Sequence, residues 1–104
     1  MTHAHSTELD VVVDTAQRRL DTLRETHERL DRITVRLTSP DNVVTVVADG
    51  SGAMVALELA ENLGSIPAHE LASTITAMAA EAATAALAQR DAILQSLQAS
   101  FTDS

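Results

Sequence analysis

Apolar and polar residues alternate along three short segments in the middle of the chain, at residues 33–39, 42–49 and 54–59. Alternation with a period of two places successive side chains on opposite faces of a β-strand. Turn-forming residues separate the segments, with Ser-Pro-Asp-Asn at 39–42 and Asp-Gly-Ser-Gly at 49–52. The pattern therefore predicts an antiparallel meander of three strands.

Two long helical stretches, over about residues 6–32 and 67–100, flank the strands. Thr7 and Asp10 are typical of a capping-box start for the first helix, and Pro67 suits the first turn of the second. The helices would reach roughly 40 and 50 Å, whereas the strands span roughly 20–26 Å. Their apolar stripes would project into water unless a second copy or another partner covers them.

The first helix carries a regular seam of apolar positions, spaced alternately by four and three residues: Leu9, Val13, Ala16, Leu20, Leu23, His27 and Leu30. A narrow seam of this kind favours pairing with another helix, in a dimer or within the chain, although an amphipathic helix packed on its own domain has a similar pattern. Leu20, Leu23 and His27 are candidates for a dimer interface. Protonation of a seam histidine at acidic pH would loosen the pairing.

The second and third strands are apolar on both faces. Val44, Val46 and Ala48 form the face that the helices of the chain itself would cover. A water-exposed face of an antiparallel sheet is normally polar, so we expect the opposite face to form an interface between sheets. The candidates for that interface are Val43, Val47, Met54 and Ala56. The alternative is that these β-branched residues only reflect strand propensity.

The composition indicates one thinly packed domain over residues 1–104, and we expect residues 1–5 and 102–104 to be disordered. Phe101 is the only aromatic residue, so little area is buried per core side chain, and oligomerisation would add stability. Cysteine is absent, which fits a reducing compartment. We find no run of 18 apolar residues and no secretory signal, so we expect no membrane span and a cytoplasmic location.

The clustered arginines favour binding of nucleic acid, whereas the net negative charge and the acidic neighbours of these arginines oppose it. The net charge is −8, lysine is absent, and six of the seven arginines fall within residues 18–36. The candidates for binding DNA phosphates are Arg18, Arg29 and Arg32, which share an outward stripe, and the adjacent Arg19. Acidic residues are interleaved with them, and Glu25–Arg29 and Glu28–Arg32 have the spacing of helical ion pairs. This interleaving is more typical of a solvated, salt-bridged face.

No pattern in the chain points to catalysis. The sequence contains none of the nucleophile-elbow, zinc-protease, Walker or dinucleotide-binding motifs. A free N-terminus followed by a histidine at position 3 could bind copper or nickel, but the position of His3 and His5 in a tail favours no role. We therefore expect a non-enzymatic binding protein without a metal or cofactor.

Residues 42–62 (NVVTVVADGSGAMVALELAEN) and the alanine-rich stretch 65–89 (SIPAHELASTITAMAAEAATAALAQ) resemble the YbaB/EbfC family of bacterial nucleoid-associated proteins. The resemblance implies an α+β homodimer with stacked sheets and projecting helical arms. It also implies DNA binding with little sequence preference, no catalytic activity, and a location at the nucleoid.

The chain departs from that family's pattern in its charges. Members often have lysine-rich first helices, whereas lysine is absent here, so no DNA-contact residue can be carried over from the family. An alternative function is therefore an adaptor or chaperone-like factor, linked to type VII secretion, which grips a helical protein partner and does not bind DNA.

Overall fold

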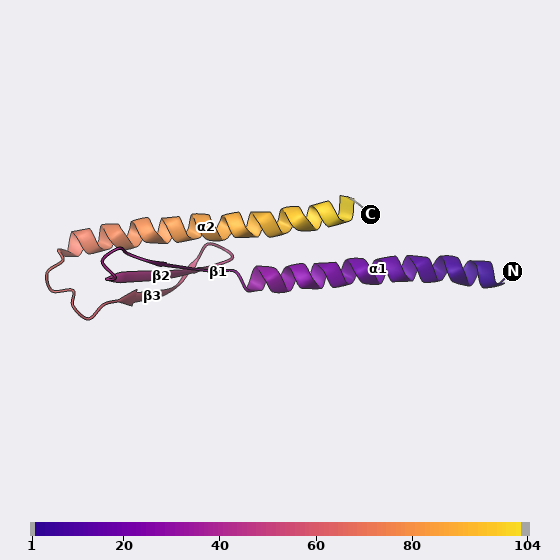
Figure 1. The fold of residues 1–104 in the computed structure, drawn as a ribbon, viewed down its shortest axis with the longest axis horizontal. Helices are drawn as coiled ribbons and strands as arrows, with labels where there is room; N and C mark the ends of the chain where they lie inside the picture. The colour runs from indigo at the N-terminus through magenta and orange to yellow at the C-terminus, as the bar shows by residue number, and fades with distance from the viewer. Residues whose placement is uncertain (1, 103–104) are drawn as a thin grey trace.

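The computed structural model, which describes residues 2–102, contains two long helices and a sheet of three strands (Figure 1). The elements are α1 (Thr2–Asp31), β1 (Thr34–Thr38), β2 (Val44–Asp49), β3 (Met54–Leu59) and α2 (Ala68–Thr102). The order confirms the predicted α+β fold of a helix, an antiparallel meander and a second helix. Of the ends for which disorder was expected, residues 1 and 103–104 lie outside the described range.

Two of the differences between the predicted and the observed element boundaries have a local cause. Helix α1 begins at Thr2, so Thr7 lies inside it, and the prediction that Thr7 caps the helix was wrong. No glycine or proline precedes Thr7 to stop the helix from extending. Strand β2 begins at Val44 rather than at residue 42, because Asn42 adopts a left-handed conformation with φ of 62° and belongs to the turn.

The sheet has the order β1-β2-β3, and both pairings are antiparallel. Its register aligns Leu37 of β1 with Val46 of β2 and Leu57 of β3, so these three side chains share one face. A bulge beside Ala48 shifts the register of β3. The turn between β2 and β3 contains Gly52, whose φ of 85° suits a residue without a Cβ.

Helix α2 covers β1 and β2 on the face that carries Val46 (Figure 1). The buried apolar residues confirm the predicted core face of the sheet and the stripe on α2: Ile33, Val35, Val44, Val46, Ala48, Met78, Ala82 and Ala86. Alanine at the centre of this contact lets the helix backbone approach the strands closely. Strand β3 has little contact with α2, and all six of its residues are exposed.

The helices extend well beyond the sheet, as the lengths predicted. Helix α2 crosses the sheet with its first half and lies along the C-terminal half of α1 with its second half, in the antiparallel direction (Figure 1). The N-terminal half of α1 continues past the end of α2, so the molecule measures 83 × 21 × 16 Å.

Helix α2 is more continuously apolar than the sequence pattern indicated. Among the described helices, it alone has the length and composition that would allow it to cross a membrane. No such span was expected from the sequence. The core helix of a soluble protein can meet the same requirement, but only 17% of the apolar window of α2 is buried in the single chain, although the helix lies on the sheet.

Candidate interaction surfaces

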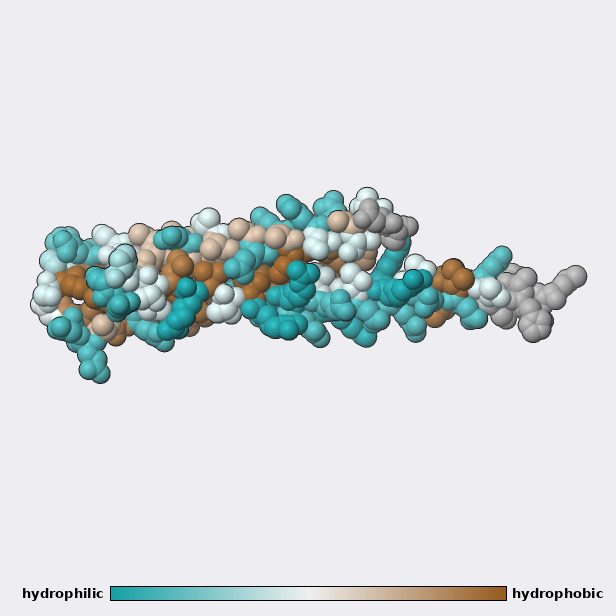
Figure 2. Space-filling view, in the orientation of Figure 1, coloured by the Kyte–Doolittle hydropathy of each residue, from teal (hydrophilic) through white to brown (hydrophobic). Residues whose placement is uncertain are grey.

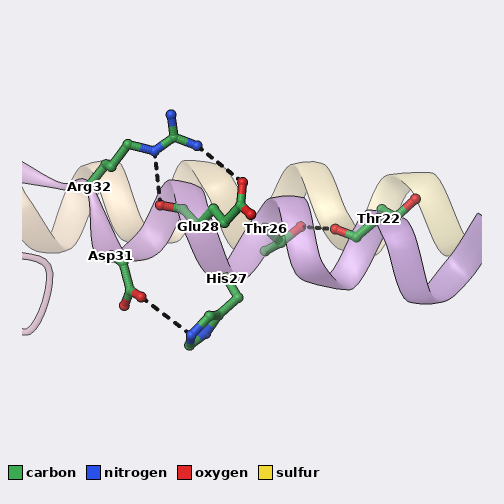
Figure 3. A network of polar contacts seen from close by, with 6 residues as sticks. All are labelled: Thr22, Thr26, His27, Glu28, Asp31 and Arg32. Atoms are coloured by element: carbon green, nitrogen blue, oxygen red, sulfur yellow. Dashed lines mark hydrogen bonds and ion pairs between the residues drawn. The ribbon is translucent and has the colours of Figure 1, made fainter.

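Helix α1 contacts α2 through a face rich in threonine rather than through its apolar seam. Thr26 is buried, and its Oγ1 donates a hydrogen bond to the carbonyl oxygen of Thr22 at 2.8 Å (Figure 3). The hydroxyl of Thr22 donates in the same way to the carbonyl of Arg18 at 2.9 Å. Because these hydroxyls bond within their own helix, they can face α2 without leaving an unpaired polar group.

The seam of α1 is exposed except at Leu30, which is half-buried and packs against the core. Leu20 and Leu23 are each 45% exposed, and Val13 is 53% exposed. His27 is also exposed, and its Nε2 lies 3.3 Å from the Oδ2 of Asp31 (Figure 3). The single chain therefore does not bury the seam in packing between its own helices, and the seam remains open to a partner.

A shallow apolar groove lies on α1 near the end of α2. Its volume is about 580 Å³, and it is lined by Val11, Val12, Thr15, Ala16, Arg19, Leu20 and Leu23. Figure 2 shows the apolar side chains as a brown band that follows the boundary between α2 and the layer beneath it. Exposed apolar surface of this extent is typical of a protein–protein contact.

The four interface candidates of the sheet lie in different environments. Val47 and Ala56 lie opposite each other on the face that is turned away from α2. Met54 is 45% exposed at the start of β3, whereas Val43 is half-buried and packs against the core. Arg36 and Glu58 also bridge β2 across the outer face, with an N–O distance of 2.6 Å. The outer face is therefore mixed in polarity.

The four candidate arginines have different surroundings. Arg18 pairs with Asp14 at 2.9 Å, and Arg32 pairs with Glu28 at 3.5 Å, as the sequence predicted for the latter (Figure 3). The guanidinium of Arg19 lies over the ring of Phe101, 6.0 Å from its centroid. Within the described part of the chain Arg29 has no ion pair, so the predicted pair of Arg29 with Glu25 does not form.

A cleft that the sequence pattern did not predict lies between α1 and the end of α2. It has a volume of about 300 Å³ and is lined by Thr15, Arg18, Arg19, Thr22, Ser100 and Phe101. Two guanidinium groups and three hydroxyls meet there, and such groups suit an anion such as phosphate. The only sequence signal was the position of Phe101, one turn beyond Leu97.

The carboxylates of the two turns stabilise the backbone. The hydroxyl and the backbone N–H of Ser51 donate to Asp49 Oδ1 at 2.6 and 2.9 Å, and they hold the pKa of Asp49 below its ordinary value. The hydroxyl of Ser39 and the N–H of Val43 lower the pKa of Asp41 in the same way. Among residues 2–102, no three potential metal ligands lie close enough to hold an ion.

The sequence model of the YbaB/EbfC DNA-binding family matches residues 6–101, which is nearly the whole chain. Comparison with curated proteins and with solved structures gave no match.

Proposed function

This chain belongs to the YbaB/EbfC DNA-binding family, and from that premise we propose that it is a non-enzymatic, nucleoid-associated homodimer that binds DNA with low sequence specificity. The family match carries the DNA-binding part of the proposal. The location that follows from it is the cytoplasm, at the nucleoid.

The exposed apolar surface supports the homodimer. Leu20 and Leu23 on α1 and Leu57 and Leu59 on β3 are all more than 40% exposed. A small domain with a single aromatic residue has little buried area to spare, so covering this surface would add to its stability. A second copy of the chain is a partner that is present wherever the chain itself is.

Helix α1 and the residue that follows it supply the arginines that would contact DNA. Arg29 is exposed and has no ion pair within the described residues, and Arg18 and Arg32 have only exposed partners, which phosphate can replace. With Arg19, these arginines would contact phosphates, which carry no sequence information. The expected result is weak, salt-sensitive binding with little dependence on sequence.

The experiment is fluorescence anisotropy on AT-rich and GC-rich duplexes over a salt series from about 50 to 200 mM. We expect similar affinities for both duplexes and a log–log slope of about −0.9 for each phosphate neutralised. Arg29→Gln should make the slope shallower, whereas Arg36→Gln, on the outer face of the sheet, should leave it unchanged. Absence of binding at the lowest salt concentration would contradict the proposal.

A second candidate function is that of a protein adaptor without DNA binding. It is favoured by the apolar groove of about 580 Å³ on α1, which suits the apolar face of a partner helix. The net charge of −8 favours it as well, because it opposes binding of a polyanion. The salt series separates the two functions, since an adaptor would show no affinity for either duplex.

A further inference from the structure

The cleft between α1 and the end of α2 has a volume of about 300 Å³, which is at the lower end of the range for small-molecule sites. Four residues of α1 and two of α2 line it: Thr15, Arg18, Arg19, Thr22, Ser100 and Phe101. The spacing of the four on α1 places them on one face of the helix. None of the six side chains is acidic, in a chain whose net charge is −8.

We propose that this cleft is a binding site for a phosphate group. Arg18 and Arg19 bind the anion, the hydroxyl of Thr15 donates a hydrogen bond to it, and Phe101 holds Arg19 in place. The phosphate belongs either to the DNA backbone or to a small phosphorylated molecule, because both present the same oxygens. In the first case the inference rests on the proposed function, and in the second it adds a ligand to that function.

The two arginines supply the charge. A guanidinium group presents its N–H donors as a rigid fork that matches pairs of phosphate oxygens. Arg18 pairs with Asp14 at 2.9 Å, but the two side chains are 71% and 64% exposed, so solvent weakens the pair and a phosphate can compete with it. Arg29 does not line the cleft, so the arginines of α1 are not equivalent.

The three hydroxyls of the cleft differ in what they can donate. Thr22 donates its hydroxyl proton to the carbonyl oxygen of Arg18 at 2.9 Å, and Ser100 donates to the carbonyl oxygen of Ser96 at 3.2 Å. Thr15 is half-buried, and its hydroxyl forms no hydrogen bond with any of residues 2–102. A hydroxyl has a single proton to donate, so Thr15 is the donor that an anion can use without breaking a bond within a helix.

Phe101 acts on the anion through Arg19. It is the only aromatic residue of the chain, and its ring is half-buried at the end of α2. The guanidinium of Arg19 lies over this ring, 6.0 Å from its centroid, where the ring attracts a cation. This contact restricts a long side chain before the anion arrives, and so it lowers the entropy lost on binding. Phe101 is therefore a positioning residue.

The place of the cleft in the fold keeps it accessible. Ser100 and Phe101 belong to the last turns of α2, at the end of that helix which lies far from the sheet (Figure 1). A homodimer that stacks its sheets would leave this end of the helices open. Each copy would then carry one phosphate site on its projecting helices.

An NMR titration of the full chain with inorganic phosphate tests the site, with the ionic strength held constant by sodium chloride. We expect the amide signals of Thr15, Arg19 and Phe101 to shift and to saturate with a Kd of roughly 1 mM. Arg19→Gln should weaken binding several-fold, whereas Arg29→Gln should leave it unchanged. Circular dichroism verifies the fold of each variant.

Matched variants test the roles of the hydroxyl and the ring. Thr15→Val should weaken phosphate binding several-fold, whereas Thr22→Val should not, because the hydroxyl of Thr22 is bonded within its helix. Phe101→Leu should weaken binding several-fold, and Phe101→Tyr should retain it, because tyrosine keeps the ring face. Equal effects of the two threonine variants would overturn the role of Thr15. Full affinity in Phe101→Leu would overturn the role of the ring.

A second titration with a DNA duplex identifies the source of the phosphate. If the duplex shifts the same amide signals and inorganic phosphate reverses the shifts, the phosphate is that of the backbone. If inorganic phosphate binds and the duplex does not, the site takes a free phosphorylated molecule, and the proposed DNA binding is overturned while this inference stands. If the duplex binds but neither titration shifts the signals of the cleft, the inference is overturned and DNA binding stands. Absence of binding in both titrations would overturn both.

Discussion

The β2–β3 turn approaches the end of α1 so closely that a Cβ on Gly50 would lie 2.9 Å from the carbonyl oxygen of Leu30. The same Cβ would lie 3.3 Å from the side chain of Ile33, which is buried in the core. A glycine at this position therefore lets the hairpin pack directly under the junction between helix and sheet.

We expect Gly50→Ala to lower the free energy of unfolding by about 1–3 kcal/mol, because the added methyl group must push against backbone. Urea unfolding followed by circular dichroism measures it. Gly64→Ala is the matched control, since a Cβ there would meet nothing within 4 Å. An equal effect of the two substitutions would contradict the close approach.

The contact between α2 and the sheet gives a second prediction. Ala86 is fully buried against the strands, whereas Ala88 lies on the exposed side of the same helix. Ala86→Leu should destabilise the protein by about 1–3 kcal/mol through overpacking. Ala88→Leu should change the free energy of unfolding by less than about 0.5 kcal/mol, and thermal unfolding of both variants at one protein concentration provides the comparison.

The two turns predict a dependence on pH at the acidic end. The pKa values of Asp41 and Asp49 are lowered in the folded chain, so the ionised carboxylates stabilise the fold. This contribution is fully present above the unfolded pKa of about 3.9 and is lost as the pH falls through the lower folded values. Carboxyl carbon shifts measured by NMR should show both groups titrating below that value. Asp49→Asn should reduce stability at pH 6 more than at pH 2.5.

The ion pair across the outer face of the sheet should contribute little. Arg36 and Glu58 are each 58% exposed, so solvent screens their attraction despite the separation of 2.6 Å. A double-mutant cycle with alanine at both positions should give a coupling energy of about 0.2–1 kcal/mol. A larger coupling would indicate that a partner covers this face, and the cycle thus also tests whether the outer face forms an interface between sheets.

The alternation of side chains in the strands was enough to predict the meander and its core face. Val44, Val46 and Ala48 are buried, and the apolar stripe of α2 covers them. The period of the pattern determines these features locally, and tertiary packing did not override it. The family was also evident from the strand and helix segments, and it is confirmed by the match over residues 6–101.

The relative placement of the two helices could not be predicted. The seam of Leu20 and Leu23 was a candidate for packing against α2, yet α1 presents Thr22 and Thr26 instead. Threonine in a helix can bond its own backbone and pack as a small apolar group, so a face rich in threonine gives little hydrophobic signal. The cleft around Arg19 and Phe101 could not be predicted either, because it depends on where α2 ends along α1.

Within the described residues, α2 ends beside Thr15 and Arg18, and the turns of α1 that precede them extend past it as a single helix (Figure 1). A free helix of this length is only marginally stable in water. Its amide protons should therefore exchange with deuterium quickly in dilute solution and slowly once a partner is bound, while those of the sheet change little. The tip of α1 is thus an internal, label-free reporter of the fraction of protein that is assembled.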